Sequence, residues 1–150
     1  MKKLLLVLIL AVAGFSAQAQ KADKINWLTF EEAALMTEKD PKMIIVDVYT
    51  DWCGWCKKMD KGTFTDPAVV KYINDTFYPV KMNAENSTRK FSFKGQEYTE
   101  QTMARAMRVS SYPNFIIMDA AMENITQMPG YREAEPFLET LQAVLKQFNP

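Results

Sequence analysis

The chain has 150 residues, the length of one ordinary domain, and nearly half of them are hydrophobic, so it can form a core without stabilising metals or cross-links. Its 18 basic and 18 acidic residues balance, so we expect neither a nucleic-acid partner nor an acidic interaction tail. Histidine does not occur, which removes the commonest general base and the commonest metal ligand.

Residues 1–19 have the pattern of an export signal. The chain starts with a basic lysine pair, continues with an apolar run over 4–13, and reaches the small-x-small sequence AQA. Because the apolar run is shorter than the roughly 20 residues of a spanning helix, a cleaved signal is favoured over the alternative, a retained membrane anchor. We expect cleavage after Ala19 and an exported protein, periplasmic or secreted, in a compartment that permits disulfides.

The rest of the chain reads as a loosely held lead-in over 20–28 and one domain over 29–150. Thr29 and Glu32 have the spacing of a capping box, so the first helix is expected to begin there. Helices are predicted at 29–39, at about 54–61, from 67 onward, at 99–109 and at 133–148. Strands are predicted at 43–50, 77–84, 114–119 and 123–130. This order indicates an α/β fold with a central mixed β-sheet flanked by helices.

The two cysteines of the sequence, Cys53 and Cys56, stand at the start of the second predicted helix. Three residues apart on a helix, they lie on one face and can reach disulfide geometry. A helix N-terminus favours negative charge, so Cys53 is expected to ionise more easily than a free thiol and to attack a disulfide. Cys56, one turn deeper, is then the resolving thiol.

Other interpretations of the pair are weaker. A structural zinc site needs about four ligands, so two cysteines without histidine leave only a metal shared between chains. A structural disulfide across so short a loop would stabilise the fold little. A redox pair is therefore favoured, and we expect no metal or organic cofactor.

The stretch VDVYTDWCGWCKKM, residues 46–59, resembles the active-site region of the thioredoxin superfamily, where a buried strand with an aspartate leads into WCxxC. Asp47 and Lys81 occupy the superfamily's positions for a buried acid and a nearby lysine. Pro113, preceded by Tyr112, is similar to its cis-proline. Gly130 matches the superfamily's glycine after the last strand, and the resemblance covers residues 29–148. The stretch TFTDPAVVKYIND, at 63–75, is similar to the C-terminal domain of periplasmic disulfide reductases.

The resemblance implies a thioredoxin-like fold and roles for the residues around the cysteines. Asp47 would be buried with a raised pKa and accept the proton of Cys56, or else would pair with Lys81 for structure alone. Pro113 in cis would shape the groove, where the Tyr112 backbone would pair with an extended substrate segment.

Two tryptophans and a glycine complete the expected site. Trp52 would either shield the disulfide or serve as a plain core residue, and Gly54 would be a supporting residue of the site. Trp55 would contact substrate or cover the disulfide. It stands where thioredoxin has proline, so the direction of electron flow is not set by the motif, although a reductant or exchange catalyst is favoured.

The expected partners are disulfide-containing proteins and a membrane thiol–disulfide electron donor, and the protein is expected to be a monomer. Two alternatives remain: a thioredoxin-fold binding module with an incidental cysteine pair, and a disulfide isomerase. The insertion at 85–98 departs from thioredoxin, and its aromatic residues Phe91, Phe93 and Tyr98 would either recognise a partner or pack onto the body. Lys94-Gly95 would form the turn of a small hairpin there.

Overall fold

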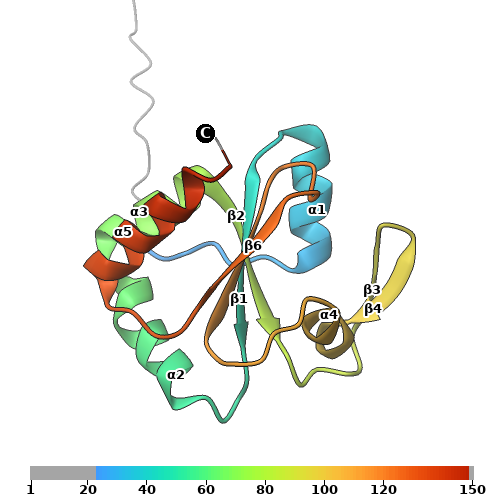
Figure 1. The fold of residues 1–150 in the computed structure, drawn as a ribbon, viewed down its shortest axis with the longest axis horizontal. Helices are drawn as coiled ribbons and strands as arrows, with labels where there is room; N and C mark the ends of the chain where they lie inside the picture. Colours follow the sequence, from blue (N-terminus) through green and yellow to red (C-terminus); the bar gives the residue numbers. More distant parts are fainter. Residues whose placement is uncertain (1–22, 149–150) are drawn as a thin grey trace, which may run out of the picture.

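A four-stranded mixed sheet organises the part of the chain that the computed structural model describes, residues 23–148 (Figure 1). The strands are β1 (Met43–Tyr49), β2 (Phe77–Asn83), β3 (Lys90–Phe93), β4 (Gln96–Thr99), β5 (Asn114–Met118) and β6 (Ile125–Pro129). The helices are α1 (Phe30–Lys39), α2 (Gly54–Lys61), the short 3-10 helix η1 (Thr63–Thr65), α3 (Pro67–Thr76), α4 (Glu100–Ala106) and α5 (Ala134–Leu145).

The sheet has the strand order β2-β1-β5-β6, with β3 and β4 paired apart as a hairpin. Strand β1 runs parallel to β2 and antiparallel to β5, and β6 is antiparallel to β5. The predicted fold class, a mixed sheet flanked by helices, is confirmed. Asp47 in the central strand lies opposite Lys81 of β2 and Phe115 of β5, which places its carboxyl inside the molecule.

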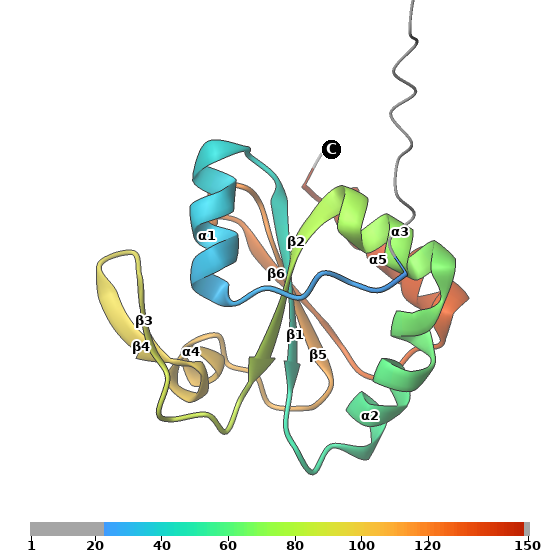
Figure 2. The same ribbon diagram turned by 180° about the vertical axis from the view of Figure 1, so that it is seen from behind.

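Helices cover both faces of the sheet. Figures 1 and 2 show α2, α3 and α5 on one side, and α1, α4 and the β3–β4 hairpin on the other. The two faces bury separate apolar clusters, one around Phe64, Phe115 and Phe137 and the other around Phe30 and Phe91. Strand β1 is an almost continuous apolar run because both of its faces are covered in this way.

The ends of several helices follow their predicted signals. Thr29 and Glu32 form the capping box of α1, and the Asp66 side chain accepts hydrogen bonds at the start of α3. Helix α4 ends at Ala106, three residues before the predicted end. Arg108 has a left-handed φ of 56°, which breaks the helical path.

The expectation of a loosely held lead-in is wrong for residues 25–28. Ile25 is buried, and Leu28 forms a parallel bridge with Val80 of β2. The N–H of Leu28 donates to the carbonyl of Pro79, and the N–H of Lys81 donates back to the carbonyl of Leu28. These residues extend the sheet at the open edge of β2, so they belong to the folded domain.

The insertion forms the expected hairpin, with positive φ values at Lys94 and Gly95 in its turn. Phe91 and Phe93 both pack on Phe30 of α1, with ring centroids 5.3 and 5.2 Å apart. The packing alternative for these aromatic residues is therefore the one that the structure supports.

No helix within residues 23–148 is long and apolar enough to cross a membrane. The predicted export signal and its alternative, a retained anchor, lie outside the described residues.

Candidate active site

A disulfide between Cys53 and Cys56 occupies the start of α2. Cys53 is the N-cap, and its sulfur accepts a hydrogen bond of 3.1 Å from the N–H of Cys56. This N–H and the helix N-terminus favour negative charge on the Cys53 sulfur, as an attacking thiolate requires. Cys53 and Cys56 are only 4% and 2% exposed, so a partner must dock closely to react.

A buried carboxyl lies in the strand that leads to this helix. Asp47 is 1% exposed, and burial raises its pKa from 3.8 to about 6, although the Lys81 ammonium opposes the rise. The Lys81 Nζ lies 2.7 Å from Asp47 Oδ2. The other oxygen, Oδ1, has no hydrogen-bond partner within the described part of the chain. The carboxyl is therefore half-paired and can take up a proton near neutral pH.

Lys81 joins that carboxyl to a second one on α2. Its ammonium also forms an ion pair with Asp60, whose side chain is partly exposed. Burial alone would lower the pKa of Lys81, but the carboxylates of Asp47 and Asp60 outweigh burial and raise it. Lys81 is thus a permanent cation that connects the interior at Asp47 to the surface at Asp60.

The loop before β5 brings the predicted proline to the site. The peptide bond between Tyr112 and Pro113 is cis, as expected, and Pro113 is buried. The carbonyl of Pro113 accepts a hydrogen bond of 2.9 Å from the N–H of Gly130, which has a φ of 95°. The Tyr112 ring packs edge-on against Trp52 at 5.8 Å, so the loop lies beside the residue that precedes Cys53.

Trp52 is not a core residue, which overturns that alternative. It is 67% exposed, and its Nε1–H donates to Glu85 Oε1 over 2.9 Å. An exposed indole fixed by Tyr112 and Glu85 can shield the disulfide and present an aromatic surface to a partner.

Trp55 forms a second exposed aromatic surface with neighbours different from those of Trp52. It is 56% exposed, and its ring lies 4.8 Å from that of Tyr131. The Lys58 ammonium sits over both rings, 5.2 Å from Trp55 and 4.7 Å from Tyr131. Gly54, between Cys53 and Trp55, has open space where a Cβ would stand, so the structure gives no steric reason for glycine there.

Glu85 and Tyr131 were missed from the sequence, as were the pairing of Lys81 with Asp60 and the contact of Lys58 with two aromatic rings. Asp60 stands four residues after Cys56, a spacing that places it on the same helix face and could have identified it. Within residues 23–148 there is no group of three or more Cys, Asp or Glu side chains arranged to hold a metal ion.

The chain belongs to the thioredoxin-like domain family, whose model matches residues 30–145. It is 28% identical over 123 residues to the "Thiol:disulfide interchange protein DsbD" of Photorhabdus laumondii subsp. laumondii. That match covers 81% of this chain and 19% of the relative, so the chain spans about a fifth of the relative's length.

Solved structures share the fold. "DsbH Oxidoreductase" superposes with a TM-score of 0.66 at 19% identity, over 84% of this chain and 88% of the other. The oxidised C-terminal domain of DsbD from Neisseria meningitidis superposes with a TM-score of 0.58 at 18% identity, over 75% and 90% of the two chains. The resemblance drawn from the CxxC stretch is confirmed.

Proposed function

We propose that the protein is a thiol–disulfide oxidoreductase that reduces or exchanges disulfides in exported partner proteins. One observation carries the proposal: the Cys53–Cys56 disulfide stands at the N-terminus of a helix in a thioredoxin-like domain. The similarity to proteins named for thiol–disulfide interchange supports the same chemistry.

The reaction runs in two exchanges. The Cys53 thiolate attacks one sulfur of the partner's disulfide, forms a mixed disulfide and releases the partner's other sulfur as a thiolate, which takes a proton from water. Cys56 then gives its proton to Asp47 and attacks the Cys53 sulfur, which releases the second partner sulfur as a thiolate that takes a proton from water. The partner gains two electrons, and the pair becomes the disulfide seen in the structure.

The surface around the pair supports a role in docking. Trp52 and Trp55 both expose aromatic rings, and each packs against a tyrosine ring. An extended partner segment would lie between them, along the backbone of Tyr112 ahead of cis-Pro113, as an added strand.

The cell context of the proposal comes from the sequence. A cleaved signal at 1–19 would deliver the protein to the periplasm or the exterior. There it would act as a monomer. A reductant in an oxidising compartment must be reduced again, and a membrane thiol–disulfide carrier is the proposed electron donor.

Two single-cysteine variants test the proposal with insulin as the disulfide substrate. Cys56→Ser should trap a mixed disulfide that dithiothreitol releases, because its attacking thiol lacks a resolving partner. Cys53→Ser should trap none and should lose insulin reduction. Retained function in cells with Cys53→Ser would contradict the proposal and favour a binding module. Refolding of scrambled ribonuclease at a rate above that of insulin reduction would favour an isomerase.

A further inference from the structure

An unassigned aromatic side chain covers the buried ion cluster. The Trp27 ring lies 5.0 Å from the Lys81 Nζ and packs edge-on against Phe64 at 5.4 Å. Trp27 precedes the region that matches the family model, 30–145. Its contacts place it against the cation that pairs with Asp47.

The backbone on both sides of Trp27 is fixed. Leu28, the next residue, exchanges hydrogen bonds of 2.8 and 3.2 Å with Pro79 and with Lys81 itself. On the other side, the N–H of Asn26 donates to the Asn74 side chain over 3.0 Å. The position of Trp27 beside Lys81 is therefore fixed by hydrogen bonds of the neighbouring backbone.

Three rings surround the Lys81 ammonium. Besides Trp27, the rings of Tyr49 and Phe64 lie 5.1 and 5.4 Å from Nζ. They attract the cation and exclude water, which leaves the Lys81 side chain only 20% exposed. Trp27 comes from outside the strands and helices, so its substitution can open this enclosure with the least effect on the sheet.

We propose that Trp27 is a positioning residue of the active site: it holds the Lys81 ammonium against the Asp47 carboxylate. Its consequence for the exchange reaction rests on the proposed function, in which Asp47 accepts the proton of Cys56. Residues 25–28 then contribute to the active site through Trp27.

Loss of the Trp27 ring is expected to change the pKa of Asp47 in one direction. The titratable groups around Asp47 are Lys81 from β2, Asp60 from α2 and, through Lys81, Tyr49 from β1. Without the indole, water reaches Lys81 and weakens its attraction for Asp47, which stays buried. Because the ionised form then loses support, the pKa of Asp47 rises.

The test is a carbon-13 carboxyl NMR titration of Asp47 in the oxidised protein, with its signal assigned by Asp47→Asn. Trp27→Ala should raise the Asp47 midpoint by about half a pH unit, and Trp27→Phe, which keeps an aromatic face, should stay within about 0.2 unit of the wild type. Leu138→Ala, which truncates a side chain packed on the same apolar cluster, is the control for lost stability and should not move the midpoint.

A Trp27→Ala midpoint that stays in place, moves down, or moves no further than that of Leu138→Ala would overturn the proposal. The titration needs no turnover, so it separates this inference from the proposed function. A raised midpoint together with no mixed disulfide in Cys56→Ser would keep the role of Trp27 and contradict the oxidoreductase.

Discussion

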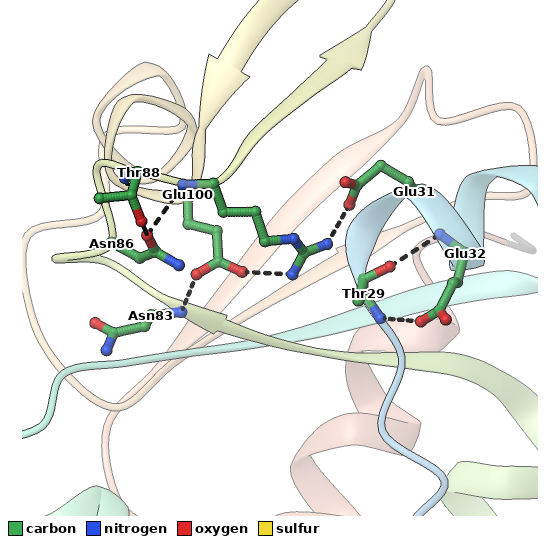
Figure 3. Close-up of polar contacts among 8 residues, drawn as sticks. Thr29, Glu31, Glu32, Asn83, Asn86, Thr88 and Glu100 are labelled. Atoms are coloured by element: carbon green, nitrogen blue, oxygen red, sulfur yellow. Dashed lines mark hydrogen bonds and ion pairs between the residues drawn. The ribbon is translucent and has the colours of Figure 1, made fainter.

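Two ion clusters within residues 23–148 each consist of one cation and two carboxylates, and the difference between them separates a reactive site from a structural one. In each, one cation bridges a buried and a more exposed carboxylate: Lys81 joins Asp47 and Asp60, and Arg89 joins Glu100 and Glu31. The first includes Asp60 of α2, the helix that carries the disulfide at its start. The second joins α1 to α4 through Arg89, which directly precedes β3, and Figure 3 labels its two acids, Glu31 and Glu100.

The buried carboxylates differ in how completely they are paired. Both oxygens of Glu100 are used, one by Arg89 at 3.2 Å and the other by the N–H of Asn83 at 3.3 Å (Figure 3). Asp47 has one oxygen on Lys81 and one without a partner in the described chain. A fully paired buried group fixes structure, whereas a half-paired one retains affinity for a proton.

The largest expected effect contrasts Asp47→Asn with Glu100→Gln. Loss of the proton acceptor should slow resolution by Cys56 about 10²-fold at pH 7, while Glu100→Gln should stay within about twofold. The measurement is the two-phase release of thionitrobenzoate when reduced protein attacks the aromatic disulfide DTNB. The first phase reports Cys53 and the second Cys56. Equal loss in both variants, or loss confined to the first phase, would break the contrast.

A second prediction concerns stability against pH. The folded pKa of Asp47 is raised from 3.8 to about 6, so the folded state binds this proton more tightly and stability is lost as pH rises between about 4 and 6. From pH 4 to pH 7 this group should remove about 2 kcal/mol of unfolding free energy.

Urea unfolding of wild type and Asp47→Asn at both pH values isolates that contribution. The difference between the two proteins should change by about 2 kcal/mol, with wild type relatively more stable at pH 4. A constant difference would show that Asp47 titrates alike in the folded and unfolded chains.

Disrupting the Arg89 cluster should lower the stability of the fold and leave the rates of disulfide exchange unchanged. Arg89→Ala leaves the Glu100 carboxylate buried without its cation, which should cost about 2 kcal/mol with exchange rates unchanged. Lys90→Ala, which breaks an exposed pair with Glu97 on the hairpin, should cost much less, because water screens that pair. Urea unfolding measures both, and an equal cost would remove the distinction between buried and exposed pairs.

The smallest effect is expected at Asp60. Its negative charge raises the pKa of Asp47 and competes for Lys81, so Asp60→Asn should lower the pH midpoint of the second DTNB phase by about half a unit. Asp75→Asn removes an exposed charge that pairs with Lys71 instead and should not shift it. An upward shift with Asp60→Asn would mean that Asp60 holds Lys81 in place instead of competing for it.

Several helices and strands and the cysteine pair could be predicted because short stretches of sequence specify them. The capping box at Thr29, the apolar run of β1 and the paired cysteines each occupy a few consecutive residues. The family resemblance added the positions of Asp47, Lys81 and the cis-proline.

The remainder depended on contacts between distant segments. Trp27 meets Lys81 only because Leu28 pairs with β2, and no pattern in the lead-in specifies that pairing. The exposure of Trp52 follows from its bond to Glu85, 33 residues away, where composition alone favours burial of a tryptophan. The unpaired Asp47 oxygen likewise emerges only from the complete set of neighbours.

The central claim is that Cys53 and Cys56 form a working redox pair. Its most direct test is the reduction potential of the mature protein, measured by equilibration with glutathione buffers. A potential near or below about −230 mV, in the range of thioredoxin and glutaredoxins, is the result that a reductase or exchange catalyst predicts. A potential near about −120 mV would reverse the proposed direction, and a pair that does not equilibrate would contradict the claim itself.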